Sequence, residues 1–201
     1  MRKSILGLGA SVLAMAIAAT ANAASEAPTP GAFTLVVMPD TQNYADYNAS
    51  ATRRSYFKVQ TEWVAANVDK HNIKYVLTLG DIVQHNDPSE WPIARDAYDV
   101  LQNAGVPYSL TAGNHDYGPG GNGSNHESLF NEDQFFGPNS PYAQQSSIGG
   151  FFGDPGKTDN SWHTFEAGGK KWMSINLEWA PRDAILQRAE EIIEAHPDHN
   201  V

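Results

Sequence analysis

The stretch Pro107-Tyr-Ser-Leu-Thr-Ala-Gly-Asn-His-Asp116 decides how this sequence folds and where its chemistry lies. Residues 107–111 predict a short buried strand, and the chain then turns at Gly113 into a run of polar side chains. Two earlier segments have the same arrangement, since the apolar run Phe33–Met38 ends at Pro39-Asp40 and the run Ile73–Leu79 ends at Gly80-Asp81. The chain thus predicts three buried strands, each followed by a turn that carries polar groups.

Helical patterns separate these strands. Apolar residues recur at helical spacing over Ser55–Lys70, and a second helix is predicted over Ser89–Asn103 with Ser89 as its N-cap. Strands that alternate with helices indicate βαβ units and a parallel sheet. Because the carboxyl ends of parallel strands meet at one edge of a sheet, the three polar turns are expected to lie together.

The second half of the sequence predicts more varied structure. Residues 161–166 and 171–177 flank the turn Ala167-Gly-Gly-Lys170 and predict a hairpin, and residues 182–195 predict a helix that His196-Pro197 ends. A short helix is expected over 127–136, an irregular segment over 137–159 and a new strand near His199. We expect core or structural positions for His163, Trp162, Trp172 and Trp179.

Composition excludes several classes of function. The chain has 201 residues, which is enough for one or two domains, and 41% of them are hydrophobic. It has no cysteine, which excludes disulfides, Cys-ligated zinc, iron–sulfur clusters and thiol catalysis. Its formal net charge of −10 argues against sequence-independent binding of nucleic acid, which needs a basic surface.

The N-terminus predicts export. Arg2 and Lys3 precede an apolar run from Ile5 to about Ala21, and Ala21-Asn-Ala23 has the small-x-small pattern of a cleavage site. We therefore expect a signal peptide over 1–23, a linker over 24–32 and a periplasmic or secreted bacterial protein with no membrane span after cleavage. The alternative is a retained membrane anchor, for which the run is short and rich in Ala and Gly.

The three post-strand turns carry possible metal ligands. Asp40 and Gln42, then Asp81, then Asn114 and His115 offer carboxylate, amide and imidazole donors, which suit divalent cations such as Mn, Fe, Zn or Mg. Asp, Asn and Gly are also ordinary turn and cap residues, so one such cluster alone would be structural. Three clusters at one sheet edge favour a functional site.

These motifs resemble the calcineurin-like metallophosphoesterases. Gly80-Asp81 and Gly113-Asn-His-Asp116 resemble two of the family's signature blocks, and Asp40-x-Gln42 resembles the first block, where Asp-x-His is more usual. The resemblance extends from about Phe33 to the C-terminus. It implies an α/β fold, a four-layer α-β-β-α sandwich of the metallophosphatase type, and a secreted bacterial subgroup.

The resemblance also implies residue roles. Asp40 would bind the first of two divalent ions (Mn, Fe or Zn), Asp81 would bridge both, and Asn114 would bind the second. Gln42 stands where the family usually has a His ligand, and its amide oxygen would either bind the metal more weakly or hold a water. His115 would stabilise the transition state or protonate the leaving group, and Asp116 would orient its ring. The implied reaction is hydrolysis of a small-molecule phosphomonoester or phosphodiester by a hydroxide that two metals activate.

The last two signature blocks of the family, with three further His ligands, are expected beyond the helix at 182–195. The domain over 33–201 is therefore interpreted as C-terminally truncated, and inactive in that form. A non-catalytic exported binding module or an inactive fragment on the same scaffold is the alternative, which Gln42 favours.

Overall fold

The structure is a computed structural model that describes residues 31–201. The predicted signal peptide over 1–23 and most of the linker over 24–32 lie outside the described residues. The predicted domain begins with the first strand, β1 (Thr34–Met38).

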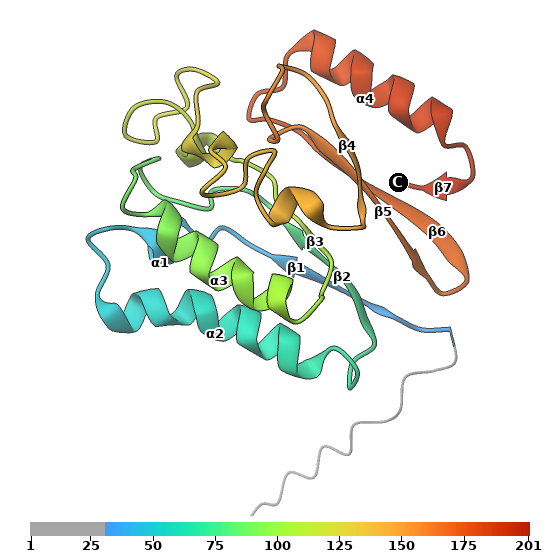
Figure 1. Ribbon diagram of the computed structural model, residues 1–201, viewed down its shortest axis with the longest axis horizontal. Helices are drawn as coiled ribbons and strands as arrows, with labels where there is room; N and C mark the ends of the chain where they lie inside the picture. The colour runs from blue at the N-terminus through green and yellow to red at the C-terminus, as the bar shows by residue number, and fades with distance from the viewer. Residues whose placement is uncertain (1–30) are drawn as a thin grey trace, which may run out of the picture.

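The first sheet is parallel and contains the three predicted strands in the order β1, β2 (Ile73–Thr78) and β3 (Tyr108–Ser109) (Figure 1). A short helix, α1 (Gln42–Ala45), and a longer one, α2 (Ala51–Asn67), connect β1 to β2. Helix α3 (Trp91–Asn103) connects β2 to β3. The predicted βαβ arrangement is confirmed.

Two helix starts differ from the prediction. Helix α2 begins four residues earlier than Ser55, because the Ser50 hydroxyl accepts a hydrogen bond from the Arg53 N–H and caps it. Helix α3 begins after Glu90, whereas the Ser89 hydroxyl donates to Asp87 in the preceding turn and does not cap the helix.

The second sheet has the order β4 (Ile148–Phe151), β5 (Ser161–Ala167), β6 (Lys170–Asn176) and β7 (His199–Asn200). Strands β4, β5 and β6 are antiparallel, which confirms the hairpin, and β7 pairs in parallel with β6. Strand β4 lies in the segment predicted to be irregular. Only glycine fits at position 149 of this strand, because a Cβ on Gly149 would collide with the ring of Trp162 on β5.

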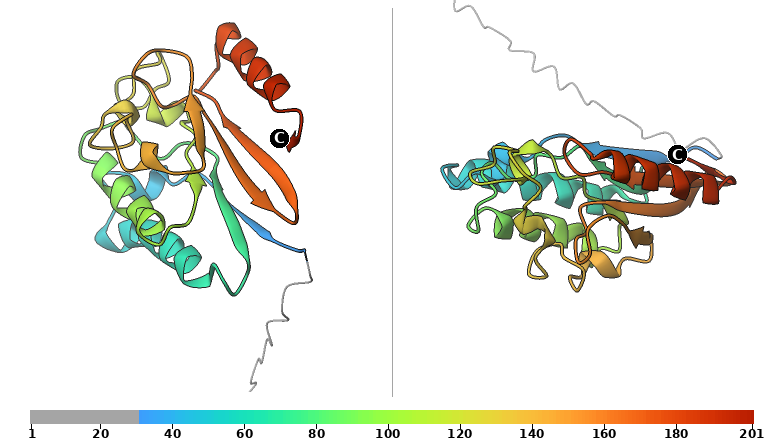
Figure 2. Two further views of the ribbon diagram at one scale, coloured as in Figure 1. Left: turned by 45° about the vertical axis from the view of Figure 1, so that its right-hand side comes forward. Right: turned by 90° about the horizontal axis from the view of Figure 1, so that it is seen from above.

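The sheets and helices stack in layers (Figures 1 and 2). Tyr75 on β2 stacks on Phe165 of β5 with ring centroids 4.4 Å apart, which joins the two sheets face to face. Helices α2 and α3 cover the other face of the first sheet, where Val76 is buried. Helix α4 (Asp183–Ala195) covers the far face of the second sheet, where Ile185 packs in one cluster with Met173. This α-β-β-α order agrees with the expected fold class.

The loops between β3 and β4 contain three short 3₁₀ helices. The helix expected over 127–136 is reduced to one such turn at Leu129–Asn131. The others are Asn114–Asp116 and Tyr142–Gln144. Across residues 31–201, no helix combines the length and the apolar character needed to cross a bilayer.

His163 lies between the two sheets, as its predicted structural role requires. It is fully buried, its Nε2 lies 3.1 Å from the Ser161 hydroxyl, and burial lowers its pKa to about 3. Because the unfolded chain binds a proton near pH 6.5 and the folded chain does not, this residue destabilises the fold as pH falls through that window. We expect the free energy of unfolding to drop by about 2 kcal/mol between pH 7.5 and pH 5 from this group alone.

Urea unfolding of the protein and of His163→Gln at the two pH values measures this effect. The variant should lose less stability on acidification than the natural protein by about that amount. Equal losses would show that His163 is not buried in its neutral form.

Candidate metal centre

The three polar turns meet at the carboxyl edge of the first sheet, as predicted. Asp40 after β1, Asp81 after β2 and Asn114 after β3 all line one open cavity of about 490 Å³. Two carboxylates and an amide from three separate turns thus converge on one space. This donor set is suited to a hard or borderline divalent cation.

Asp81 is the residue that joins the three turns. Its backbone carbonyl accepts hydrogen bonds from the N–H groups of Thr41 (3.1 Å) and Gln42 (2.8 Å). Its Oδ1 accepts from the backbone N–H of His115 at 3.0 Å. Asp81 also has a φ of +47°, a conformation that costs a non-glycine residue energy and persists at functional sites where surrounding contacts hold it.

Two glycines allow the turns to approach each other. A Cβ on Gly80, which has a φ of +99°, would lie 2.9 Å from the backbone nitrogen of Gly113. A Cβ on Gly113 would collide with the Asp81 carboxylate and lie 2.5 Å from the Asp81 nitrogen. Gly80 therefore lets the second turn approach the backbone of the third, and Gly113 keeps side-chain carbon out of the space that the Asp81 carboxylate occupies.

Substituting Gly113→Ala is expected to displace Asp81. We expect a loss of about 1–3 kcal/mol in the free energy of unfolding from overpacking. We also expect at least a tenfold loss in affinity for Mn²⁺, comparable to the loss of a supporting contact around a metal. Urea unfolding and calorimetric titration with Mn²⁺ measure the two effects.

Gly105→Ala is the matched control, since Gly105 has a φ of +68° and open space around its Cβ position. It should cost about 1–2 kcal/mol of stability, from the left-handed backbone conformation, and leave Mn²⁺ affinity unchanged. Equal effects of the two substitutions on Mn²⁺ affinity would contradict the packing role of Gly113.

The buried carboxylate of Asp116 links the second and third turns through hydrogen bonds. It accepts three backbone hydrogen bonds, from Ile82 (3.0 Å), Val83 (2.8 Å) and Gly113 (2.8 Å). Burial raises the pKa of Asp116 to about 7, against the effect of these three donors. The oxygens of Asp116 are directed at the backbone of the second and third turns, and among the described residues they form no hydrogen bond with the His115 ring that Asp116 was expected to orient.

The His115 ring is held by a different group. Its Nδ1 lies 2.8 Å from the backbone carbonyl oxygen of Gln84, so Nδ1 must carry a proton and donate it to that oxygen. This fixes the ring and leaves Nε2 to accept or donate a proton. His115 as a whole is half-buried.

Gln42 is placed differently from the other predicted ligands. It opens α1, and its backbone N–H binds Asp81, but it is not among the described residues that line the cavity. Its Oε1 atom is buried and has no hydrogen-bond partner among the described residues. A buried amide oxygen that accepts no hydrogen bond is available to bind a cation.

The opposite wall of the cavity comes from the turn after β6, which the sequence did not indicate. Leu177, Glu178 and Trp179 line it together with Ala180 and Pro181. The core position expected for Trp179 is wrong, because 45% of this residue is exposed. The signal was its place in the turn that follows a strand, as for Asp40, Asp81 and Asn114.

A second polar group lies beside the site. Ligand atoms of Asp46, His85 and Glu90 lie within 4.8 Å of one another, which is close enough to share a cation. Glu90 is fully buried, and both of its oxygens already accept hydrogen bonds, from Tyr47 and His85 on Oε1 and from Gln84 and His85 on Oε2. These bonds give Glu90 a structural role, since they connect the turn after β2 to the start of α3.

Comparison with known proteins places this arrangement in a family. The chain is 30% identical over 175 residues to the uncharacterized protein YvnB of Bacillus subtilis (strain 168). That match covers 85% of this chain and 12% of the length of that relative. Residues 33–199 match the calcineurin-like phosphoesterase family. The chain with Asp40, Asp81 and Asn114 around one cavity therefore belongs to the calcineurin-like phosphoesterase family.

Proposed function

We propose that the protein hydrolyses small-molecule phosphoesters with the help of two divalent cations bound at the carboxyl edge of the first sheet. The observation that carries this proposal is the convergence of Asp40, Asp81 and Asn114 on one cavity in a chain of this family. The close approach of Gly113 to the Asp81 carboxylate, which a Cβ would block, supports a role for that carboxylate at the site. The oxygen donors of this cavity suit Mn, and the resemblance to the family adds Fe and Zn as candidate ions.

The residues of this chain have distinct roles in the proposed reaction. Asp40, Asp81 and Asn114 would hold the ions, with Asp81 available to both, and Asn114 would also contact the phosphate. When bound, the cations neutralise phosphate charge and make water acidic enough to be deprotonated near neutral pH. His115 holds a proton at Nε2 for the departing alcohol, and its bond to Gln84 fixes the ring for that transfer.

We also propose that the protein is exported to the periplasm or beyond. The charged start, apolar run and cleavage pattern in residues 1–23 support this, and they lie outside the described residues. The chain spans only 12% of the length of the matched relative.

A turnover assay tests the proposal. The full-length protein is treated with a chelator, dialysed and assayed with phenyl phosphate and bis(4-nitrophenyl) phosphate before and after addition of Mn²⁺. We expect hydrolysis of at least one substrate that depends on the added ion. Hydrolysis that the chelator does not affect would overturn the metal-dependent mechanism. Mn²⁺ binding without any turnover would favour a binding module on this scaffold.

A further inference from the structure

The cavity has an apolar wall that metal binding does not require. Leu79 and Trp179 line the same cavity as Asp40 and Asp81, and they are 61% and 45% exposed. Large apolar side chains left open to water beside a polar site indicate contact with an apolar part of a ligand. Among the groups of this wall, Trp179 offers the largest flat surface.

Trp179 lies close to the ligand residue Asn114. A Cβ built on Gly123, which has a φ of +62°, would lie 3.1 Å from Nε1 of the Trp179 indole and 3.2 Å from Cβ of Asn114. The loop at Gly123 therefore contacts both residues, and the absence of a side chain there makes room for the indole. A molecule bound at Asn114 would be within reach of the indole.

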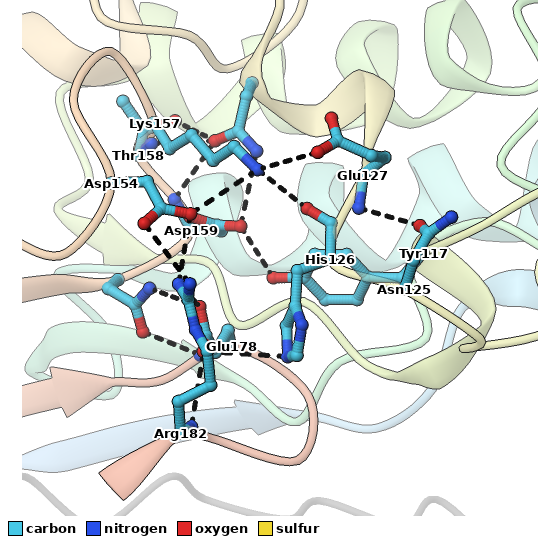
Figure 3. Close-up of polar contacts among 12 residues, drawn as sticks. Tyr117, Asn125, His126, Glu127, Asp154, Lys157, Thr158, Asp159, Glu178 and Arg182 are labelled. Carbon is cyan, nitrogen blue, oxygen red and sulfur yellow. Dashed lines mark hydrogen bonds and ion pairs between the residues drawn. The ribbon is translucent and has the colours of Figure 1, made fainter. Parts of the chain in front are cut away.

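The turn that carries Trp179 is fixed by buried charge. Glu178 is 3% exposed, and its carboxylate accepts hydrogen bonds from Asn160 and from the guanidinium of Arg182, with the shortest at 2.7 Å (Figure 3). Burial would raise the pKa of Glu178, but these bonds outweigh it and hold the pKa below its usual value. The ionised carboxylate therefore anchors the residue before Trp179.

Two more features hold the same turn. The Nε2 atom of His126 lies 3.0 Å from the Trp179 carbonyl oxygen, and Figure 3 shows His126 directed toward Glu178. Ala180, directly after Trp179, has a φ of +46°, which is strained for alanine. Strain of this kind persists where surrounding contacts over-determine the backbone. The indole is thus presented by a preorganised turn.

We propose that Trp179 determines substrate specificity, because its indole stacks on an aromatic group of the phosphoester while the phosphate lies at Asp81 and Asn114. This inference rests on the proposed function. It adds the class of substrate, which is phosphoesters in which a planar aromatic group lies close to the phosphorus atom. Stacking of this kind discriminates by about tenfold, the effect of one good aromatic contact.

The test compares phenyl phosphate with propyl phosphate in the Mn²⁺-loaded full-length protein. The quantity measured is kcat/KM for phenyl phosphate divided by kcat/KM for propyl phosphate. The two leaving groups differ in reactivity, but this difference is the same in every variant and cancels when the ratios of two variants are compared. Trp179→Ala should lower this ratio about tenfold and Trp179→Phe should restore most of it. Trp63→Ala is the matched control, because Trp63 on α2 is 52% exposed and lies outside the cavity. Its ratio should equal that of the natural protein.

A binding measurement separates this inference from the proposed function. Calorimetry gives the Kd of phenylphosphonate and of methylphosphonate in the presence of Mn²⁺, with no turnover needed. A preference for phenylphosphonate that Trp179→Ala removes supports the inference even if the protein hydrolyses nothing. An unchanged phenyl-to-propyl ratio in Trp179→Ala, or an equal loss with both phosphonates, would overturn it.

Discussion

Replacing Asp81 with Asn is expected to reduce metal-dependent hydrolysis about a thousandfold or more. Asp81 lines the cavity, and its proposed place is between two ions, so the substitution removes a negative charge from both. Stabilisation of transition-state charge by metal ions is worth several kcal/mol, and each 1.4 kcal/mol changes the rate tenfold. Calorimetric titration with Mn²⁺ should show a parallel loss of affinity.

The Asp81→Asn substitution preserves the local hydrogen bonding and has a matched control. The new amide at this position keeps an oxygen that can accept from the His115 N–H, so the turn should survive and thermal unfolding should change little. Asp46→Asn is the control, because Asp46 belongs to the second group with His85 and Glu90. Loss of Mn²⁺ affinity in Asp46→Asn, with retention in Asp81→Asn, would move the metal centre to that group.

Replacing Asp116 with Asn is expected to destabilise the fold by about 2–3 kcal/mol. One oxygen of the carboxylate receives two N–H groups and the other receives one, and the side chain is fully buried. An amide must direct its own NH₂ group at one of these sets of donors, which leaves buried N–H groups without an acceptor. The free energy of urea unfolding at pH 7.5 measures the effect.

Asp96→Asn, on the exposed side of α3, is the control and should change stability by less than about 0.5 kcal/mol. If Asp116→Asn were as stable as this control, the hydrogen bonds of the carboxylate would not be what holds the two turns together. If it abolished turnover without loss of stability, the role first expected for Asp116, orientation of the His115 ring, would be restored.

The part of the fold that sequence predicts well is the part with strong periodicity. Strands β1, β2 and β3 are short apolar runs that end in turns, and α2 and α3 show helical spacing between them. These patterns also fix the edge at which Asp40, Asp81 and Asn114 meet, because parallel strands have a common direction. The hairpin of β5 and β6 is signalled by its Gly-Gly turn.

The remainder depends on contacts between distant segments. Strand β4 is hidden in a glycine-rich stretch, since the space that Gly149 leaves is filled by Trp162 of another strand. The exposure of Trp179 depends on the anchoring of Glu178 by Asn160 and Arg182. The orientation of Asp116 depends on backbone donors 33 and 34 residues earlier. Local sequence carries no signal for these contacts.

The most direct test of the metal centre is a crystal structure of the full-length protein grown with Mn²⁺, with anomalous scattering used to locate the ions. We expect an ion peak in the cavity at Asp81, with oxygens of Asp40 or Asn114 also within coordination distance. Two results would contradict this metal centre. One is ions found only at Asp46, His85 and Glu90. The other is the absence of an ion at Asp81 in crystals of a protein that does hydrolyse phosphoesters.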